Sequence, residues 1–264
     1  GDSFMKKIAV SDVTLCGLQD EKQPLTFREK LNIASMIDTC GVDIIELPIL
    51  LNEKENAVVY RTIASTVQNA CVYVSVENAD AVESGFNSIK EAKCPGVQVV
   101  LPVSTVQMEY RYHLKASKML DKIKATCLKA KEYTDNVVFV AKDATRAESG
   151  FVKEIANAIS KIGVKAITVS DDAGVYFPED FSALVKEIKA NSDISVYVQP
   201  SDKLYMAAAC AVEAIKAGAD GVKCAVNKDS LSADVLADIF RIKGFDMKVE
   251  SNLDSTKIHK TVQD

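Results

Sequence analysis

Short runs of β-branched and other apolar residues alternate eight times with longer amphipathic stretches along this chain. Runs this apolar predict strands that are buried on both faces, which is typical of a parallel sheet. Eight such units in 264 residues predict one α/β domain, a single (β/α)8 or TIM barrel that spans residues 1–264. The expected strands are Ile8–Val13, Asp43–Leu47, Cys71–Val76, Val97–Leu101, Val137–Ala141, Ala166–Ser170, Ser195–Gln199 and Gly221–Cys224.

Local signals between these runs agree with the alternation. Thr26 followed by Glu29 predicts a capping box at the start of the first long helix. Residues 105–133 are long for one helix and predict two segments. Glycines that end helices before a strand are expected at Gly41, Gly163 and Gly218. The expected helices are Phe27–Thr39, Asn56–Thr66, Gly150–Ile162, Phe181–Ala190 and Tyr205–Ala217. At the two ends, we expect residues 1–5 to be a tag remnant or disordered lead, and residues 242–264 to be a terminal helix or tail.

Composition narrows the class of protein. A formal net charge of −5 and a pI of about 5.3 argue against a nucleic-acid or anionic-membrane surface. The sequence has no apolar run long enough to span a membrane and no signal-peptide pattern. Only two histidines occur, His113 and His259, which argues against a multi-histidine metal centre. The seven cysteines are widely spaced without a C-x-x-C pair, which predicts reduced thiols in a cytoplasmic protein rather than disulfides or a zinc site.

Several ordered motifs carry a family resemblance. The segment Asp12–Gln19 resembles the D-x-T-L-R-D-G-x-Q opening of the DRE-TIM metallolyases, the HMGL-like family of isopropylmalate synthase, homocitrate synthase and HMG-CoA lyase. Further segments that are similar to family motifs are Ser104–Tyr110, Lys142–Arg146, Ser170–Tyr176 and Gly218–Asn227. The resemblance is closest to the catalytic barrels of isopropylmalate and homocitrate synthases. It implies a barrel mouth that binds a 2-oxo acid on a divalent metal and condenses it with acetyl-CoA.

The chain departs from this pattern at the positions that carry the family chemistry. Asp12 retains the family position for a metal-binding Asp, but Cys16 replaces the Arg that stabilises an enolate, and Gly17 replaces the next Asp. The resemblance puts Tyr197 and Gln199 where the family has two histidine metal ligands, and neither a phenol nor an amide is a good transition-metal ligand. We therefore expect no cofactor and no functional divalent-metal site.

The substrate-binding positions implied by the resemblance have changed as well. Gln98 stands where the family has a histidine facing the substrate, and Asp172 replaces a Thr that holds the substrate carboxylate. Asp172 would repel such a carboxylate. Arg146 retains its family position. These three residues, with Tyr197 and Gln199, are the predicted substrate-binding set.

Charged residues at strand ends remain as catalytic candidates, because barrel enzymes place catalytic groups there. The candidates are Lys142, Glu46 and Asp171, with Lys223 near the last strand end. Either lysine could form a Schiff base with a carbonyl substrate. The alternative is structural, an ion pair in which the lysine occupies the space of the missing metal and neutralises Asp12, Glu46 or Asp171. Cys16, like Cys224, could be a nucleophile or a small buried hydrophobe, and the second reading is favoured.

Three hypotheses for function follow. In the first, the chain is a divergent homocitrate or isopropylmalate synthase-like protein that has lost its own catalysis and acts as an auxiliary subunit. In the second, it is a metal-free lyase or transferase that uses a strand-end lysine. In the third, it is a small-molecule binding module. The resemblance implies a 2-oxo acid or acyl-CoA ligand, and a homodimer or a hetero-oligomer with an active paralogue. Because the sequence ends soon after the barrel, we expect the C-terminal regulatory domain of isopropylmalate synthases to be absent.

Overall fold

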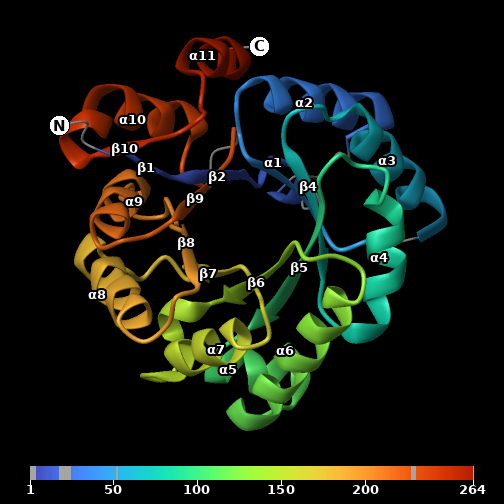
Figure 1. Cartoon of the computed structure of the whole chain (residues 1–264), viewed down its shortest axis with the longest axis vertical. Helices are drawn as coiled ribbons and strands as arrows, with labels where there is room; N and C mark the ends of the chain where they lie inside the picture. The colour runs from blue at the N-terminus through green and yellow to red at the C-terminus, as the bar shows by residue number, and fades with distance from the viewer. Residues whose placement is uncertain (1–3, 18–24, 52, 227–229, 264) are drawn as a thin grey trace.

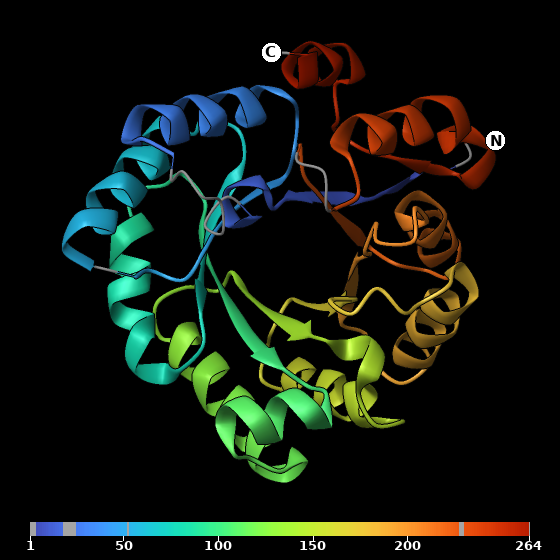
Figure 2. The same ribbon diagram turned by 180° about the vertical axis from the view of Figure 1, so that it is seen from behind.

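The computed structural model describes residues 4–17, 25–51, 53–226 and 230–263, so part of the expected lead over residues 1–5 lies outside the described residues. Eight parallel strands close into a barrel in the order β2-β3-β4-β5-β6-β7-β8-β9, which confirms the predicted fold (Figure 1). The helices form a ring outside the strands when the barrel is viewed from either side (Figures 1 and 2). The strands are β2 (Ala9–Asp12), β3 (Ile44–Leu47), β4 (Cys71–Val76), β5 (Pro95–Pro102), β6 (Val137–Lys142), β7 (Ala166–Ser170), β8 (Ser195–Gln199) and β9 (Gly221–Cys224).

The helices follow the strands in the expected alternation. Their bounds are α1 (Thr14–Gly17), α2 (Phe27–Thr39), α3 (Glu53–Thr66), α4 (Val82–Ile89), α5 (Thr105–Gln107), α6 (Ala116–Lys131), α7 (Phe151–Ser160), α8 (Pro178–Lys189), α9 (Ala207–Lys216), α10 (Ala233–Met247) and α11 (Ser255–Gln263). Thr26 and Glu29 form the predicted capping box at the start of α2. Gly41, Gly163 and Gly218 all have positive φ, as expected for glycines that end helices.

Residues 105–133 and the terminal region 242–264 each contain more than one secondary-structure element. The stretch over residues 105–133 contains α5, a π-helical turn at Met108–Tyr112, and α6, so the predicted division into segments is confirmed. The terminal region 242–264 begins inside α10, then forms the short strand β10 (Val249–Glu250) and α11. β10 pairs in parallel with β1 (Lys6–Lys7), outside the barrel. This pairing ties the end of α10 to the chain just before the first barrel strand.

Side chains along each strand alternate between the helices and the barrel interior. In β4, Val72 and Val74 belong to the large apolar cluster shared with the helices. Tyr73 lies in a separate small cluster with Ile44 and Val138, which occupies the interior. Because successive side chains of a strand point to opposite faces, the next interior position after Tyr73 on β4 is Ser75. The interior therefore changes from apolar and aromatic at the start of the strands to polar near their carboxyl ends.

Two glycines make room for the aromatic part of this interior. A Cβ on Gly221 would lie 2.6 Å from the Tyr197 ring, and a Cβ on Gly96 would likewise collide with the Tyr73 ring. Since real Cβ contacts are longer than this, a side chain at either position would displace a ring. The two tyrosines thus form a floor across the barrel, and their rings lie where the strands begin.

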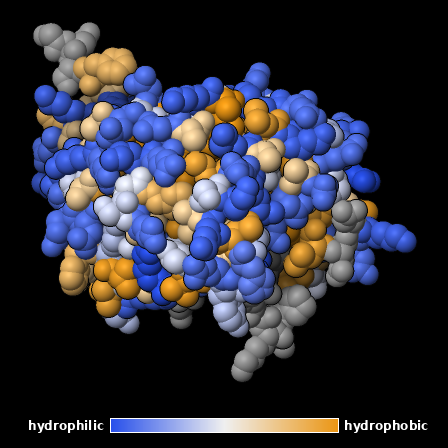
Figure 3. Space-filling view, turned by 90° about the horizontal axis from the view of Figure 1, so that it is seen from below, coloured by the Kyte–Doolittle hydropathy of each residue, from blue (hydrophilic) through white to orange (hydrophobic). Residues whose placement is uncertain are grey.

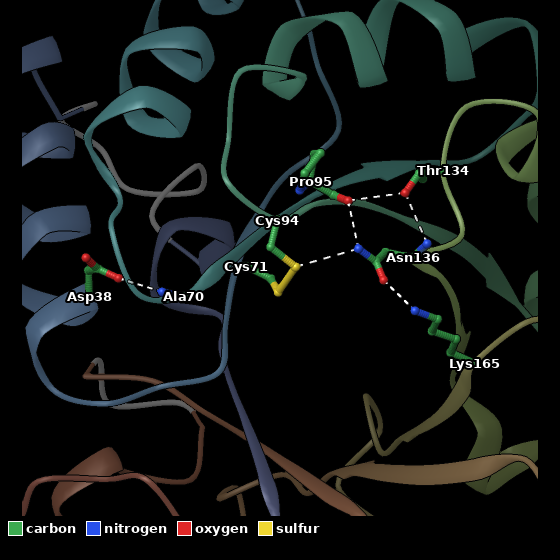
Figure 4. Close-up of a disulfide and its surroundings, with 8 residues drawn as sticks. All are labelled: Asp38, Ala70, Cys71, Cys94, Pro95, Thr134, Asn136 and Lys165. Atoms are coloured by element: carbon green, nitrogen blue, oxygen red, sulfur yellow. Dashed lines mark hydrogen bonds between the residues drawn. A yellow bond between two sulfur atoms is a disulfide. The ribbon is translucent and has the colours of Figure 1, made fainter.

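The prediction that all cysteines are reduced was wrong for one pair. Cys71 and Cys94 form a disulfide, with 4.5 Å between their Cα atoms (Figure 4). The register of β4 and β5 pairs Val72 with Pro95, so the residues just before these two, Cys71 and Cys94, also become neighbours. A spacing of 23 residues contains one whole helical crossover, and so the proximity is invisible in the linear sequence. The other five cysteines are free.

The surface is mostly hydrophilic on the face shown in Figure 3, with small apolar areas between polar side chains. None of the described helices is long and apolar enough to cross a membrane.

Candidate functional site

A buried polar network fills the interior near the carboxyl ends of the strands. It comprises Ser11 of β2, Glu46 of β3, Ser75 of β4, Gln98 of β5 and Lys223 of β9, and each of these residues is at most 5% exposed. Neighbouring strands bring these residues to one level because their register is parallel and continuous around the barrel. This is the end at which barrel enzymes carry their active sites.

Glu46 lies at the centre of this network. Its Oε1 is 2.6 Å from Lys223 Nζ, and both side chains are almost fully buried. Ser11 Oγ donates to the same Oε1 at 2.7 Å, and Gln98 Nε2 donates to Oε2 at 2.9 Å. Gln98 Nε2 also lies 2.7 Å from Ser75 Oγ, and Lys223 Nζ lies 3.4 Å from Gln98 Oε1. Each Glu46 oxygen therefore accepts from at least one neighbour, and the buried negative charge is neutralised by one ammonium group.

Asp12 faces a different direction from this network. Ser11, the residue before it, points into the interior, and Val13, the residue after it, lines the mouth cavity. By alternation the Asp12 side chain points away from that cavity. Its Oδ1 accepts from Thr14 N at 2.9 Å and its Oδ2 accepts from Thr14 Oγ1 at 3.1 Å, so both carboxyl oxygens are engaged by the first residue of α1. Burial raises the pKa of Asp12 to about 7, so the carboxyl is partly protonated at neutral pH.

The two residues at the implied metal-ligand positions of β8 are separated. Gln199 lines the mouth cavity. Tyr197 lies two residues earlier on the strand, and its ring covers Gly221 at the floor. Burial raises the pKa of the Tyr197 phenol. Both side chains point to the same face of β8, but of the two only Gln199 lines the mouth cavity, while Tyr197 lies one step nearer the floor.

The donor chemistry of this end does not suit a divalent metal. Within the described parts of the chain, no three His, Cys, Asp or Glu side chains lie close enough to hold a metal ion. Asp12 is occupied by Thr14, and the centre of the interior holds the Lys223 ammonium group. An ammonium at this place would repel a divalent cation, and the surrounding serine and glutamine side chains are poor ligands for zinc or manganese.

Two adjoining hollows form the open mouth above the network. One of about 310 Å³ reaches down to Glu46, Gln98 and Lys223. The other, of about 470 Å³, lies over the ends of β5, β6 and β7 and is lined by charged side chains. Lys142 of β6 lines both hollows. Its Nζ is 3.9 Å from Asp172 Oδ1, and the two side chains are 47% and 37% exposed. Of the two candidate lysines, Lys142 is thus the accessible one.

Arg146 lines the larger hollow and is held in place by Asp143. Arg146 Nε and Nη2 donate to the Asp143 carboxylate at 2.8 Å and 2.6 Å. Ser104 Oγ donates to the same carboxylate at 2.5 Å. Asp143 has φ of 55°, a left-handed conformation in which aspartate is tolerated better than most residues. The ion pair raises the pKa of Arg146, so this guanidinium is a fixed positive charge at the mouth.

Asp171 has a role in the loop after β7. Its Oδ1 accepts from Thr145 Oγ1 at 2.7 Å and from Gly174 N at 3.0 Å. Its Oδ2 accepts from Tyr176 N at 3.1 Å. The carboxylate is buried and lines neither hollow of the mouth. The geometry therefore supports a loop-ordering role for Asp171 rather than contact with a substrate.

Burial disfavours the thiolate form of Cys16, just after β2, and of Cys224, at the end of β9. Cys16 is half-buried, lines the smaller hollow, and lies 3.5 Å from the Glu46 carbonyl oxygen. Burial, together with the charge of Glu46, raises the pKa of Cys16. Burial also raises the pKa of Cys224. Since the thiolate is the nucleophile, both results favour the interpretation as small, inert side chains.

The structure adds residues to the mouth that the sequence interpretation missed. Arg111 and Tyr112 both bind Glu77 Oε2, at 3.0 Å and 2.9 Å, and all three line the larger hollow with Lys203. Glu77 follows directly after β4, and this place at a strand end was the one sequence signal that could have predicted it as a mouth residue. The two histidines lie elsewhere: His113 is exposed after the π-helical turn, and His259 of α11 lies 3.2 Å from Asp238.

Comparisons with known proteins agree with the arrangement of the barrel. Residues 7–228 match the HMGL-like family. The chain is 30% identical over 227 residues to 2-isopropylmalate synthase of Rhodopseudomonas palustris strain BisA53, covering 84% of this chain and 44% of the relative. A second relative, the Bradyrhizobium sp. BTAi1 2-isopropylmalate synthase, is 31% identical over 43% of its length. The chain thus spans under half the length of these relatives.

Solved structures share the fold at low identity. The HMG-CoA lyase of Brucella melitensis superposes with a TM-score of 0.82 at 13% identity, covering 98% of this chain and 97% of that one. The carboxyl transferase domain of Rhizobium etli pyruvate carboxylase superposes with a TM-score of 0.72 at 15% identity, covering 98% of this chain and 47% of that one. These likenesses concern the barrel alone.

Proposed function

The chain belongs to the HMGL-like family, and from this premise we propose that its barrel does not carry out the metal-dependent condensation of a 2-oxo acid with acetyl-CoA by itself. It serves instead as an auxiliary subunit whose mouth binds a ligand. The isopropylmalate synthases that it resembles give the parent reaction, and the proposal concerns what remains of that reaction in this chain.

The observation that carries the proposal is the ion pair between Lys223 and Glu46. The two groups lie 2.6 Å apart at the centre of the interior, with Gln98 and Ser11 completing the hydrogen bonds of the carboxylate. Each polar group of this network has a partner among the described residues, which supports a structural role for the network. A buried charge is tolerated when it is paired and hydrogen-bonded, which explains why the network persists without chemistry.

The test is a paired measurement of metal content and turnover. Purified protein would be assayed for bound zinc, manganese and magnesium, and for condensation of acetyl-CoA with pyruvate, 2-oxoisovalerate and 2-oxoglutarate. The R. palustris relative, treated identically, is the positive control. We expect substoichiometric metal and no turnover above background in this chain. Stoichiometric metal together with turnover would refute the proposal.

A second candidate function rests on the accessibility of Lys142. This side chain is half-exposed in the mouth, and its one ion-pair contact among the described residues is the long one to Asp172. In its neutral form the amine could add to a substrate carbonyl and lose water, giving an imine. Borohydride would reduce that imine to a stable secondary amine, which mass spectrometry locates. Labelling at Lys142 that is absent in Lys142→Arg would favour this candidate over the first.

For partners and location, the proposal includes a homodimer or a hetero-oligomer with an active paralogue, and residence in the cytoplasm. Light scattering after size-exclusion chromatography tests the assembly. Disulfides persist mainly in oxidising compartments, so the Cys71–Cys94 bond makes the location worth testing directly. Rapid alkylation of thiols in intact cells would find both cysteines reduced in a cytoplasmic protein. Full protection from alkylation would contradict that location.

A further inference from the structure

The larger hollow of the mouth contains charges of both signs. Its volume is about 470 Å³. Four cationic side chains line it, from Arg111, Lys142, Arg146 and Lys203, together with three carboxylates, from Glu77, Asp143 and Asp172. A pocket built for a simple dianion would be more positive, and one built for an amine would be more negative. The mixture favours a ligand that carries both charges.

Several of these charged groups keep unused hydrogen-bonding atoms. Asp172 Oδ2 accepts from Asp143 N, but its Oδ1 has only Lys142 Nζ at 3.9 Å among the described residues. Glu77 Oε2 takes both Arg111 and Tyr112, which leaves Oε1 without a described donor. The cavity wall therefore offers negatively charged carboxylate oxygens that can still accept a hydrogen bond from a ligand.

Two cationic side chains of the hollow, Arg146 and Lys142, also keep N–H groups that can donate to a ligand. Arg146 uses Nε and Nη2 on Asp143, so its Nη1 has no acceptor among the described residues. The Lys142 ammonium makes no hydrogen bond within 3.5 Å to a described residue, since its carboxylate neighbour is 3.9 Å away. A ligand carboxylate between these two cations would gain charge-assisted hydrogen bonds without breaking an existing one.

We propose that this hollow binds a small α-amino acid as its zwitterion. The ligand carboxylate lies at Lys142 and Arg146, and the ligand ammonium lies at Asp172 Oδ1. Apolar residues on the wall, Val100 and Pro102, leave room for a short aliphatic side chain. The inference rests on the proposed function, because it assigns a ligand class to a mouth that no longer condenses 2-oxo acids.

The physical basis is the discrimination that Asp172 provides. A 2-oxo acid and its α-amino acid share the carboxylate and the side chain, and differ in a carbonyl against an ammonium at the α-carbon. The carbonyl oxygen of the 2-oxo acid would be repelled by the Asp172 carboxylate, because both groups are hydrogen-bond acceptors and neither has a proton to donate. The ammonium would instead donate a charge-assisted hydrogen bond to it. One such contact corresponds to roughly tenfold or more in affinity.

The experiment is isothermal titration calorimetry of the whole chain with matched ligand pairs. These pairs are L-valine with 2-oxoisovalerate, L-alanine with pyruvate, and L-glutamate with 2-oxoglutarate. We expect at least one amino acid to bind roughly tenfold tighter than its oxo partner. Equal or tighter binding of the oxo acid in every pair overturns the inference, and so does the absence of binding by all six compounds.

Two variants locate the effect. Asp172→Asn keeps an oxygen for the Asp143 N–H, so the loop stays in place while the charge is removed. It should abolish the preference for the amino acid. Lys142→Met should weaken both members of a pair. The matched controls are Lys118→Met and Asp121→Asn, since that exposed pair lies on α6 outside the barrel. A preference that survives in Asp172→Asn overturns the inference.

The outcome is separable from that of the proposed function. Turnover with bound metal, together with amino-acid binding that depends on Asp172, would refute the proposed function and leave the inference standing. No turnover and no amino-acid binding would refute the inference and leave the proposed function standing. Each readout uses the same purified protein, so a folding defect would be seen in both.

Discussion

Replacing Lys223 by methionine should destabilise the barrel strongly, because it leaves the Glu46 carboxylate buried without its counter-charge. The two charged atoms are 2.6 Å apart, which corresponds to about 6 kcal/mol of attraction at an effective dielectric constant of about 20. Desolvation of both ions offsets part of this, and breaking one side of a buried pair typically costs about 3–5 kcal/mol. Ser11 and Gln98 still donate to Glu46 in the variant, so we expect the lower end of that range.

The companion variants isolate the charge from the packing. Lys223→Met combined with Glu46→Gln removes both charges, and the amide introduced by the second substitution can still accept from Ser11 through its oxygen. We expect this double variant to recover about 2 kcal/mol relative to Lys223→Met, since the uncompensated charge is gone. Glu46→Gln alone supplies the remaining corner of the double-mutant cycle.

The assay is urea unfolding followed by far-UV circular dichroism, because the chain has no tryptophan to report by fluorescence. Reductant is omitted so that the Cys71–Cys94 disulfide stays intact. Equal slopes for the four proteins would show that unfolding exposes similar surface in each. A loss below about 1 kcal/mol in Lys223→Met, or a coupling energy near zero, would refute the view that the pair is a buried, mutually dependent unit.

Three further predictions concern the rest of the barrel. Burial raises the pKa of Asp12 from 3.8 to about 7, so folding favours the protonated form, and the free energy of unfolding should fall by up to about 4 kcal/mol as the pH rises from 4 to 8. Asp12→Asn should flatten this pH dependence in unfolding measurements. An unchanged pH dependence in the variant would contradict the assignment to Asp12. Replacing Cys71 and Cys94 together by serine should lower stability by about 3 kcal/mol, from the loop of 23 residues, and dithiothreitol should then shift the melting temperature of the parent but not of the variant. Gly221→Ala should cost about 1–3 kcal/mol by displacing the Tyr197 ring; Gly221→Ala combined with Tyr197→Leu should regain part of the loss, whereas an additive loss would argue against the contact.

The sequence by itself determined the barrel and most of its boundaries. β4, β7, β8 and β9 begin and end at the predicted residues, and so does α2. This success has a local cause, since apolar runs, caps and helix-ending glycines act within a few residues of one another. The family motifs likewise identified Arg146, Lys142 and Gln98 as residues of the mouth, because motif order fixes which strand end each one occupies.

Only the tertiary structure decided which of these groups meet. Lys223 was proposed as a partner for a carboxylate, yet the sequence left open whether that was Asp12, Glu46 or Asp171. Barrel closure selected Glu46, because β9 pairs with β2 and β2 in turn pairs with β3. Tyr197 is at the floor because strand alternation and the space over Gly221 place it there.

The disulfide is the clearest case of the same limit. Cys71 and Cys94 have no local signal, and they meet because β4 and β5 pair in one particular register across a helical crossover. Contacts between residues far apart in the chain depend on how strands align around the closed barrel. A one-residue change in that alignment would turn each interior side chain outward, so the network, the floor and the mouth all follow from the register.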